Sequence, residues 1–88
     1  MTETSINYAK ALYELSVPEE AVLETEKIFR STPQLKGALE NPLVSLKEKE
    51  HVIDRVFPQE MKNFLKITCK YQKISSIEEI LEAYGDYR

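Results

Sequence analysis

The side chains that most often perform catalysis or bind metals are scarce in this chain of 88 residues. His51 is the only histidine and Cys69 the only cysteine. A structural zinc site uses several histidine or thiolate ligands, and a nucleophilic cysteine needs a base beside it. We therefore expect a solvated His51, a Cys69 that acts as a small buried hydrophobe, and no catalytic, metal-binding or cofactor-binding residues. A small enzyme built on His51 or Cys69 stays open as an alternative and would require a pocket.

The carboxylates gather at two places where helices are expected to begin. Negative side chains stabilise a helix N-terminus through the helix dipole, so these groups are explained without an active site. A carboxylate-bridged di-metal site would use Glu-x-x-His pairs, which the sequence lacks. The two groups are Glu19, Glu20, Glu24 and Glu26, and Glu78, Glu79 and Glu82.

The composition indicates one helical domain over residues 1–88. Apolar residues make up 42% of the chain and charged residues 31%, which is typical of a folded globular protein. Two glycines are too few for a turn-rich β fold. The net charge of -3 gives no general attraction to nucleic acid, and no apolar run reaches the roughly 18 residues that span a bilayer. We expect an all-α fold.

Prolines and capping residues divide the chain into a six-helix bundle. All 4 prolines fall at expected boundaries. In a capping box, a serine hydroxyl and a glutamate three residues later satisfy the first backbone N–H groups. The first expected helix is capped by Thr4 or Ser5 and ends near Ser16, the second is opened by a Ser16–Glu19 box and ends near Ser31, and the third covers 34–40. The fourth is opened by a Ser45–Glu48 box after Asn41-Pro42 and ends near Phe57. The fifth covers 58–73, and the sixth is capped by Ser75-Ser76 with Glu78-Glu79 and frays near Gly85.

Two of these helices are apolar over an unusually wide arc. With 100° between successive residues, the apolar side chains of the first helix and of the helix over 58–73 each cover about 220°, whereas the fourth and sixth helices cover about 140–160°. A helix this apolar either lies at the centre of the bundle or packs the core with one side and a partner with the other. Periodicity alone leaves both interpretations open.

A lysine stripe runs along the polar side of the helix over 58–73. Lys62, Lys66 and Lys70 follow one another at i, i+4 and i+8, and Lys73 extends the stripe. A solvated face is the ordinary interpretation of such a stripe. A nucleic-acid-binding helical domain is the alternative, although the chain is net acidic and carries no recognition motif. An acidic face on a protein partner is the third interpretation.

Three segments in order resemble one known family across nearly the whole chain. They are Tyr-Ala-Lys-Ala-Leu-Tyr-Glu-Leu at 8–15, Leu-Glu-Asn-Pro-Leu-Val-Ser-Leu-Lys-Glu-Lys at 39–49, and Asn-Phe-Leu-Lys-Ile at 63–67 with Ile74. The pattern is similar to the delta subunit of the bacterial F-type ATP synthase, the counterpart of the mitochondrial oligomycin-sensitivity-conferring protein. The resemblance implies a six-helix amino-terminal domain without catalytic activity. That domain holds the amino-terminal helix of an alpha subunit and anchors the catalytic head against rotor torque.

The resemblance also implies where the partner helix binds. The site is a groove between the first helix and the helix over 58–73, the two helices with wide apolar arcs. Its implied residues are Tyr8, Ala11, Leu15, Asn63 and Ile67, with Lys66 and Lys70 on the rim and Leu12 on either the groove or the core side. The core side is expected to hold Ile6, Ala9, Tyr13, Phe64, Leu65 and Thr68.

Full-length members of the family carry a carboxy-terminal region that engages the b subunit of the peripheral stalk. We expect this chain to be an isolated, truncated amino-terminal domain without that region. The resemblance implies a peripheral membrane protein on the cytoplasmic face of a bacterial inner membrane, as part of a proton-translocating ATP synthase. The domain itself is expected to be soluble, without direct membrane insertion and without nucleic acid.

Overall fold

A computed structural model describes residues 3–87 and shows an all-α bundle, with six α-helices, one 3-10 turn and no strand in that part of the chain. The all-α six-helix prediction is therefore confirmed. The elements are α1 (Glu3–Glu14), α2 (Glu19–Ser31), α3 (Pro33–Glu40), α4 (Leu46–Val56), α5 (Gln59–Lys70), η1 (Ile74–Ser76) and α6 (Ile77–Tyr87).

The start of α4 follows the expected capping chemistry. The Ser45 hydroxyl accepts a hydrogen bond from the Glu48 backbone N–H at 3.2 Å. Asn41 ends α3 in an extended conformation, and its side-chain oxygen accepts a hydrogen bond from the Leu43 N–H at 2.9 Å. An extended residue before a proline is the ordinary consequence of the steric demand of the proline ring. The turn between α3 and α4 is thus fixed by local sequence.

The expected Ser16–Glu19 capping box is wrong. Ser16 adopts a left-handed conformation with φ 56°, and its N–H donates to the Tyr13 carbonyl at 3.1 Å. Ser16 therefore closes the end of α1, while Pro18 occupies the N-cap of α2. A left-handed residue at this place is a common way to end a helix.

α5 ends at Lys70, which is earlier than the expected Lys73. Gln72 takes a φ of 59°, and its N–H donates to the Cys69 carbonyl at 3.1 Å. The Lys73 N–H donates to the Thr68 carbonyl at 2.7 Å. These two bonds form a Schellman motif, which usually has glycine at the left-handed position.

The start and end of α6 also differ from expectation. Ile74–Ser76 form a 3-10 turn that leads directly into α6, so the two serines lie inside this turn. The helix continues through Gly85 to Tyr87 instead of fraying at the glycine. Glycine costs a helix only about 1 kcal/mol relative to alanine, and the burial of Tyr84 and its neighbours outweighs that cost.

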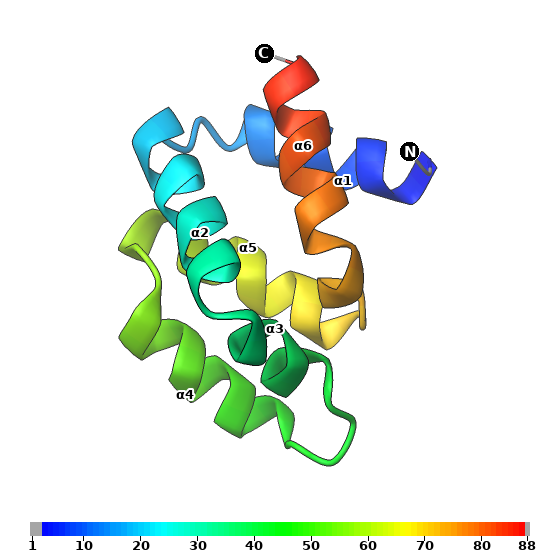
Figure 1. Ribbon diagram of the computed structural model, residues 1–88. Coiled ribbons are helices and arrows are strands. Elements are labelled where there is room, and N and C mark those ends of the chain that lie inside the picture. The colour runs from blue at the N-terminus through cyan, green and yellow to red at the C-terminus, as the bar shows by residue number, and fades with distance from the viewer. Residues whose placement is uncertain (1–2, 88) are drawn as a thin grey trace.

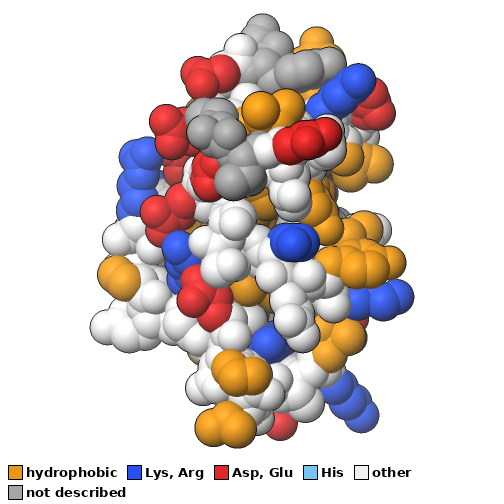
Figure 2. Space-filling model, turned by 90° about the vertical axis from the view of Figure 1, so that its right-hand side faces the viewer, with side chains coloured by type: hydrophobic (Ala, Val, Ile, Leu, Met, Phe, Trp, Pro, Cys, Tyr) orange, Lys and Arg blue, Asp and Glu red, His pale blue; other side chains and the backbone are white. Residues whose placement is uncertain are grey.

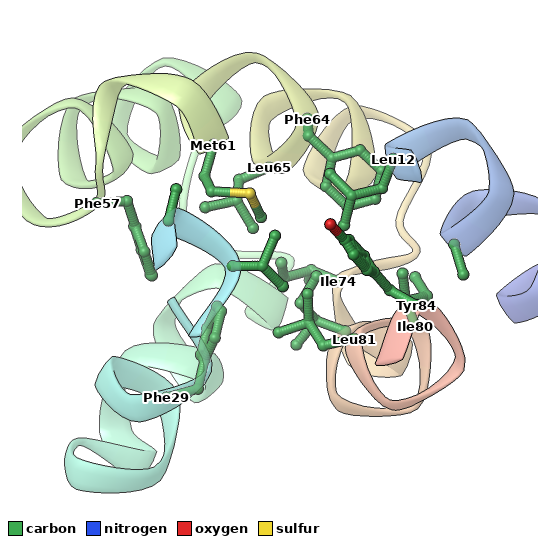
Figure 3. Close-up of a cluster of buried hydrophobic side chains, with 14 of the residues drawn as sticks. Leu12, Phe29, Phe57, Met61, Phe64, Leu65, Ile74, Ile80, Leu81 and Tyr84 are labelled. Atoms are coloured by element: carbon green, nitrogen blue, oxygen red, sulfur yellow. The ribbon is translucent and has the colours of Figure 1, made fainter. Parts of the chain in front are cut away.

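The helices pack so that α1 and α5 have different main partners. α1 packs chiefly on α6 and α5 chiefly on α4, while α2 contacts α3, α5 and α6. Figure 1 shows α1 and α6 crossing at one end of the molecule, with α3 and α4 at the other. Side chains from α1, α2, α5 and α6 meet in the centre (Figure 3). The labelled members of this cluster are Leu12, Phe29, Phe57, Met61, Phe64, Leu65, Ile74, Ile80, Leu81 and Tyr84.

Replacing Gln72 by glycine should stabilise the domain. Glycine removes the steric cost of a left-handed side-chain residue, and we expect the free energy of unfolding to rise by about 0.5–1 kcal/mol. Urea denaturation followed by circular dichroism measures this change. Gln72→Ala is the matched control, because alanine keeps the Cβ and should give no gain; a less stable glycine variant would contradict the assigned cap.

Candidate partner-binding groove

α1 and α5 face each other through their side chains. The rings of Tyr8 on α1 and Phe64 on α5 meet edge to face, with centroids 6.3 Å apart and planes at 77°. Phe64 is buried and Tyr8 is half-buried. This aromatic contact forms the base of the space between the two helices.

A shallow hollow of about 460 Å³ opens beside this contact, and side chains of α4, of α5 and of the turn after α1 line it. Its lining mixes apolar groups with both signs of charge. The lining residues are Leu15 from the turn after α1, Glu50 from α4, and Asn63, Phe64, Lys66, Ile67 and Lys70 from α5.

The hollow carries large apolar side chains that remain exposed. Leu15 keeps 59% of its surface exposed and Ile67 keeps 45%. Ala11 and Asn63 are also exposed. In Figure 2, orange hydrophobic side chains gather along the right-hand edge of the molecule, and blue lysine or arginine side chains lie among them. Contiguous apolar surface with a polar border is typical of interaction sites.

The lysines of the expected rim are engaged with neighbours. The Lys66 ammonium lies 2.8 Å from the Asp54 carboxylate of α4. The hydrogen bond from Lys66 lowers the pKa of Asp54, against an opposing effect of desolvation. Lys70 places its ammonium 5.7 Å from the centroid of the Tyr71 ring. The stripe is therefore not a continuous row of unpaired cations, which weakens the nucleic-acid alternative.

Leu12 belongs to the core and not to the groove. Its side chain is fully buried at 0% exposure, so no partner can reach it. Of the other expected groove positions, Tyr8 is half-buried against Phe64, Ala11 is exposed but is not among the residues that line the hollow, and Leu15 lines the hollow from just after the end of α1. Leu12 points into the cluster shown in Figure 3.

The expected core side of α1 is wrong at two positions. Ile6 and Tyr13 are each 47% exposed. The expected core position Ala9 is confirmed, and Ser5, which was not expected there, is also buried, because α1 packs chiefly on α6 and turns that face inward. On α5 the core assignment is confirmed, since the expected residues are all buried. They are Phe64, Leu65 and Thr68.

Two exposed or half-buried residues near this surface were missed by the sequence interpretation. Glu50 reaches the hollow from α4, and Tyr71 is 57% exposed at the end of α5. Glu50 and Asp54 are four residues apart and so share one side of α4. Two carboxylates with this spacing on α4 could pair with the lysine stripe of α5. This complementarity is the sequence signal that could have placed α4 beside the groove.

The candidate reactive residues lie apart from one another. His51 is exposed on α4, as expected for a solvated residue. Cys69 is buried, and desolvation raises the pKa of its thiol, which disfavours the reactive thiolate. Among residues 3–87, no cluster of histidine, cysteine or carboxylate side chains could hold a metal ion, and no helix of that range is long and apolar enough to cross a membrane.

The fold defines the chain as a small all-α bundle with a lysine-edged hollow that α4, α5 and the end of α1 line with apolar and charged side chains. Residues 5–88 match the family model described as the ATP synthase delta (OSCP) subunit. The chain therefore belongs to the ATP synthase delta (OSCP) subunit family, and the matches support an amino-terminal domain of that family.

Curated relatives agree with this family. The chain is 33% identical to ATP synthase subunit delta of Clostridioides difficile (strain 630) over 91 residues, which cover 90% of this chain and 50% of that protein. It is 28% identical to the chloroplastic ATP synthase subunit delta of Trieres chinensis, over 88% of this chain and 47% of that protein. A similar match, also 28% identical, is to ATP synthase subunit delta of Prochlorococcus marinus (strain MIT 9301), over 88% of this chain and 49% of that protein. The chain spans about half the length of these relatives. No solved structure matches the chain.

Truncating Leu12 should destabilise the domain far more than truncating Leu15. Leu12→Ala removes a fully buried side chain and should cost about 2–5 kcal/mol, whereas an exposed site such as Leu15 should change by less than about 0.5 kcal/mol. Denaturation of both variants by urea measures the two costs. Equal destabilisation would contradict the division of α1 between core and surface.

Proposed function

We propose that this domain is a non-catalytic part of the stator of a proton-translocating F-type ATP synthase. In this role it binds the amino-terminal helix of an alpha subunit in the groove between α1 and α5. The observation that carries the proposal is the exposure of Leu15 and Ile67 on either side of one hollow. The names of the relatives, all ATP synthase delta subunits, support a place in that complex.

The groove suits an amphipathic helix laid along it. Such a helix presents apolar anchors at i, i+3, i+4 and i+7, and each fully buried leucine-sized side chain contributes about 1.5–3 kcal/mol. Ala11 is small and allows the partner backbone to approach α1. Asn63 is exposed at the hollow and can orient the partner through hydrogen bonds.

The mechanical role follows from binding alone. A stator has to hold the catalytic head still while the rotor applies torque, and this needs a stable contact rather than chemistry. A helix of about 20 residues is about 30 Å long, which is comparable to the 34 Å longest dimension of the domain.

The place of the domain in the cell follows from the same proposal. The domain would be peripheral to the membrane, on the cytoplasmic face of a bacterial inner membrane, and would be held there by other subunits. Contact with the b subunit of the peripheral stalk belongs, by the family resemblance, to a carboxy-terminal region. None of residues 3–87 is assigned to that contact.

Ile67→Asp should abolish binding and leave the fold intact. An unpaired carboxylate buried against an apolar partner costs several kcal/mol, which corresponds to a loss of affinity of about a hundredfold or more. Calorimetric titration with a synthetic peptide of the alpha-subunit amino terminus measures the loss. Leu23→Asp on α2 is the matched control, because Leu23 is equally exposed at 52% and lies outside the hollow.

The fold of the Ile67→Asp variant is checked by its helical circular dichroism and its melting temperature. Unchanged values with lost binding support the groove. A collapsed melting temperature would make Ile67 a structural residue, and full binding by a folded variant would place the partner elsewhere.

A further inference from the structure

One acidic side chain lies inside the hollow and belongs to neither α1 nor α5. Glu50 comes from α4, is half-buried, and lines the hollow together with Leu15 and Ile67. α4 therefore supplies a third wall to the groove. The packing of α4 on α5 holds this wall in place.

The carboxylate of Glu50 has no ion-pair partner among residues 3–87. This is notable because Lys66 and Lys70 line the same hollow. The Lys66 ammonium is held by Asp54 at 2.8 Å, and the Lys70 ammonium lies over the Tyr71 ring. Each lysine thus has its own neighbour, and the carboxylate of the half-buried residue Glu50 is available to an external group.

The apolar surroundings of Glu50 favour a long basic side chain as that group. Lysine and arginine lay their methylene stems along apolar surface while the charged head reaches a polar partner. Leu15, Phe64 and Ile67 provide such a surface beside Glu50. The hollow of 460 Å³ is within the usual range of about 300–1,000 Å³ for binding pockets, so it has room for this side chain.

We propose that Glu50 is a specificity-determining residue, which pairs with a lysine or arginine on the helix that docks between α1 and α5. The inference rests on the proposed function and adds a charge requirement to it. The stem of the basic residue packs on Leu15 and Ile67, and its head forms a charge-assisted hydrogen bond with the Glu50 carboxylate. A helix with only apolar and acidic groups on its docking face would then bind weakly.

The test is the affinity of the alpha-subunit amino-terminal peptide for Glu50→Gln, Glu50→Lys and the unchanged domain. Glu50→Gln should weaken binding about three- to tenfold, and Glu50→Lys should weaken it further because it places like charge against the basic residue. The difference should shrink as salt is added. Glu24→Gln on α2 is the matched control, since Glu24 is exposed and lies outside the hollow.

The pairing itself is tested by changing each lysine and arginine of the peptide to glutamine in turn. One of these changes should weaken binding to the unchanged domain and have no further effect on the Glu50→Gln domain, as a double-mutant cycle requires for a direct pair. If the Glu50→Gln domain bound the peptide equally well or more tightly, while Ile67→Asp still abolished binding, the role of Glu50 would be overturned. The proposed binding of the peptide in the groove would still be supported. Failure of the unchanged domain to bind the peptide would overturn both.

Discussion

α1 and α5 bury apolar side chains in the core and also leave large ones exposed, among them Ile6 and Tyr13 on α1 and Ile67 on α5. Each helix packs on a different main partner, α1 on α6 and α5 on α4, and one apolar side of each helix remains. The half-buried ring of Tyr8 on α1 contacts the buried ring of Phe64 on α5. The core, the aromatic contact and the exposed strip are thus consequences of the same wide apolar arcs.

Charge defines the border of this strip. The pair of Asp54 and Lys66 joins α4 to α5 at 2.8 Å, and this contact lowers the pKa of the Asp54 carboxyl group. An exposed ion pair of this kind adds little stability. Its effect is on position, because it directs the Lys66 ammonium toward Asp54. Glu50 then remains the unpaired charge facing the hollow.

Much of the fold is predictable because local signals decide it. Prolines and the Ser45 cap set several helix boundaries. The cap of α2 and the end of α5 were mispredicted, because Ser16 and Gln72 adopt left-handed conformations that sequence rules reserve mainly for glycine and asparagine. The stop of α6 was mispredicted because packing outweighed the low helix propensity of Gly85.

The groove was harder to derive than the fold. A helical wheel gives the width of an apolar arc but not the direction from which neighbours cover it. Ile6, Ala9 and Tyr13 were all expected in the core, but only Ala9 is buried there, together with the unexpected Ser5. The contribution of Glu50 depends on the packing of α4 against α5, which no pattern within α5 reveals.

The most direct measurement is an NMR titration of the isotope-labelled domain with a peptide from the amino terminus of the alpha subunit of the same organism. The account predicts saturable chemical-shift changes concentrated on Tyr8, Ala11, Leu15, Asn63 and Ile67. Absence of shifts at millimolar peptide, where a binding free energy of only about -4 kcal/mol would be visible, would contradict it. Shifts confined to another face of the bundle would contradict it equally.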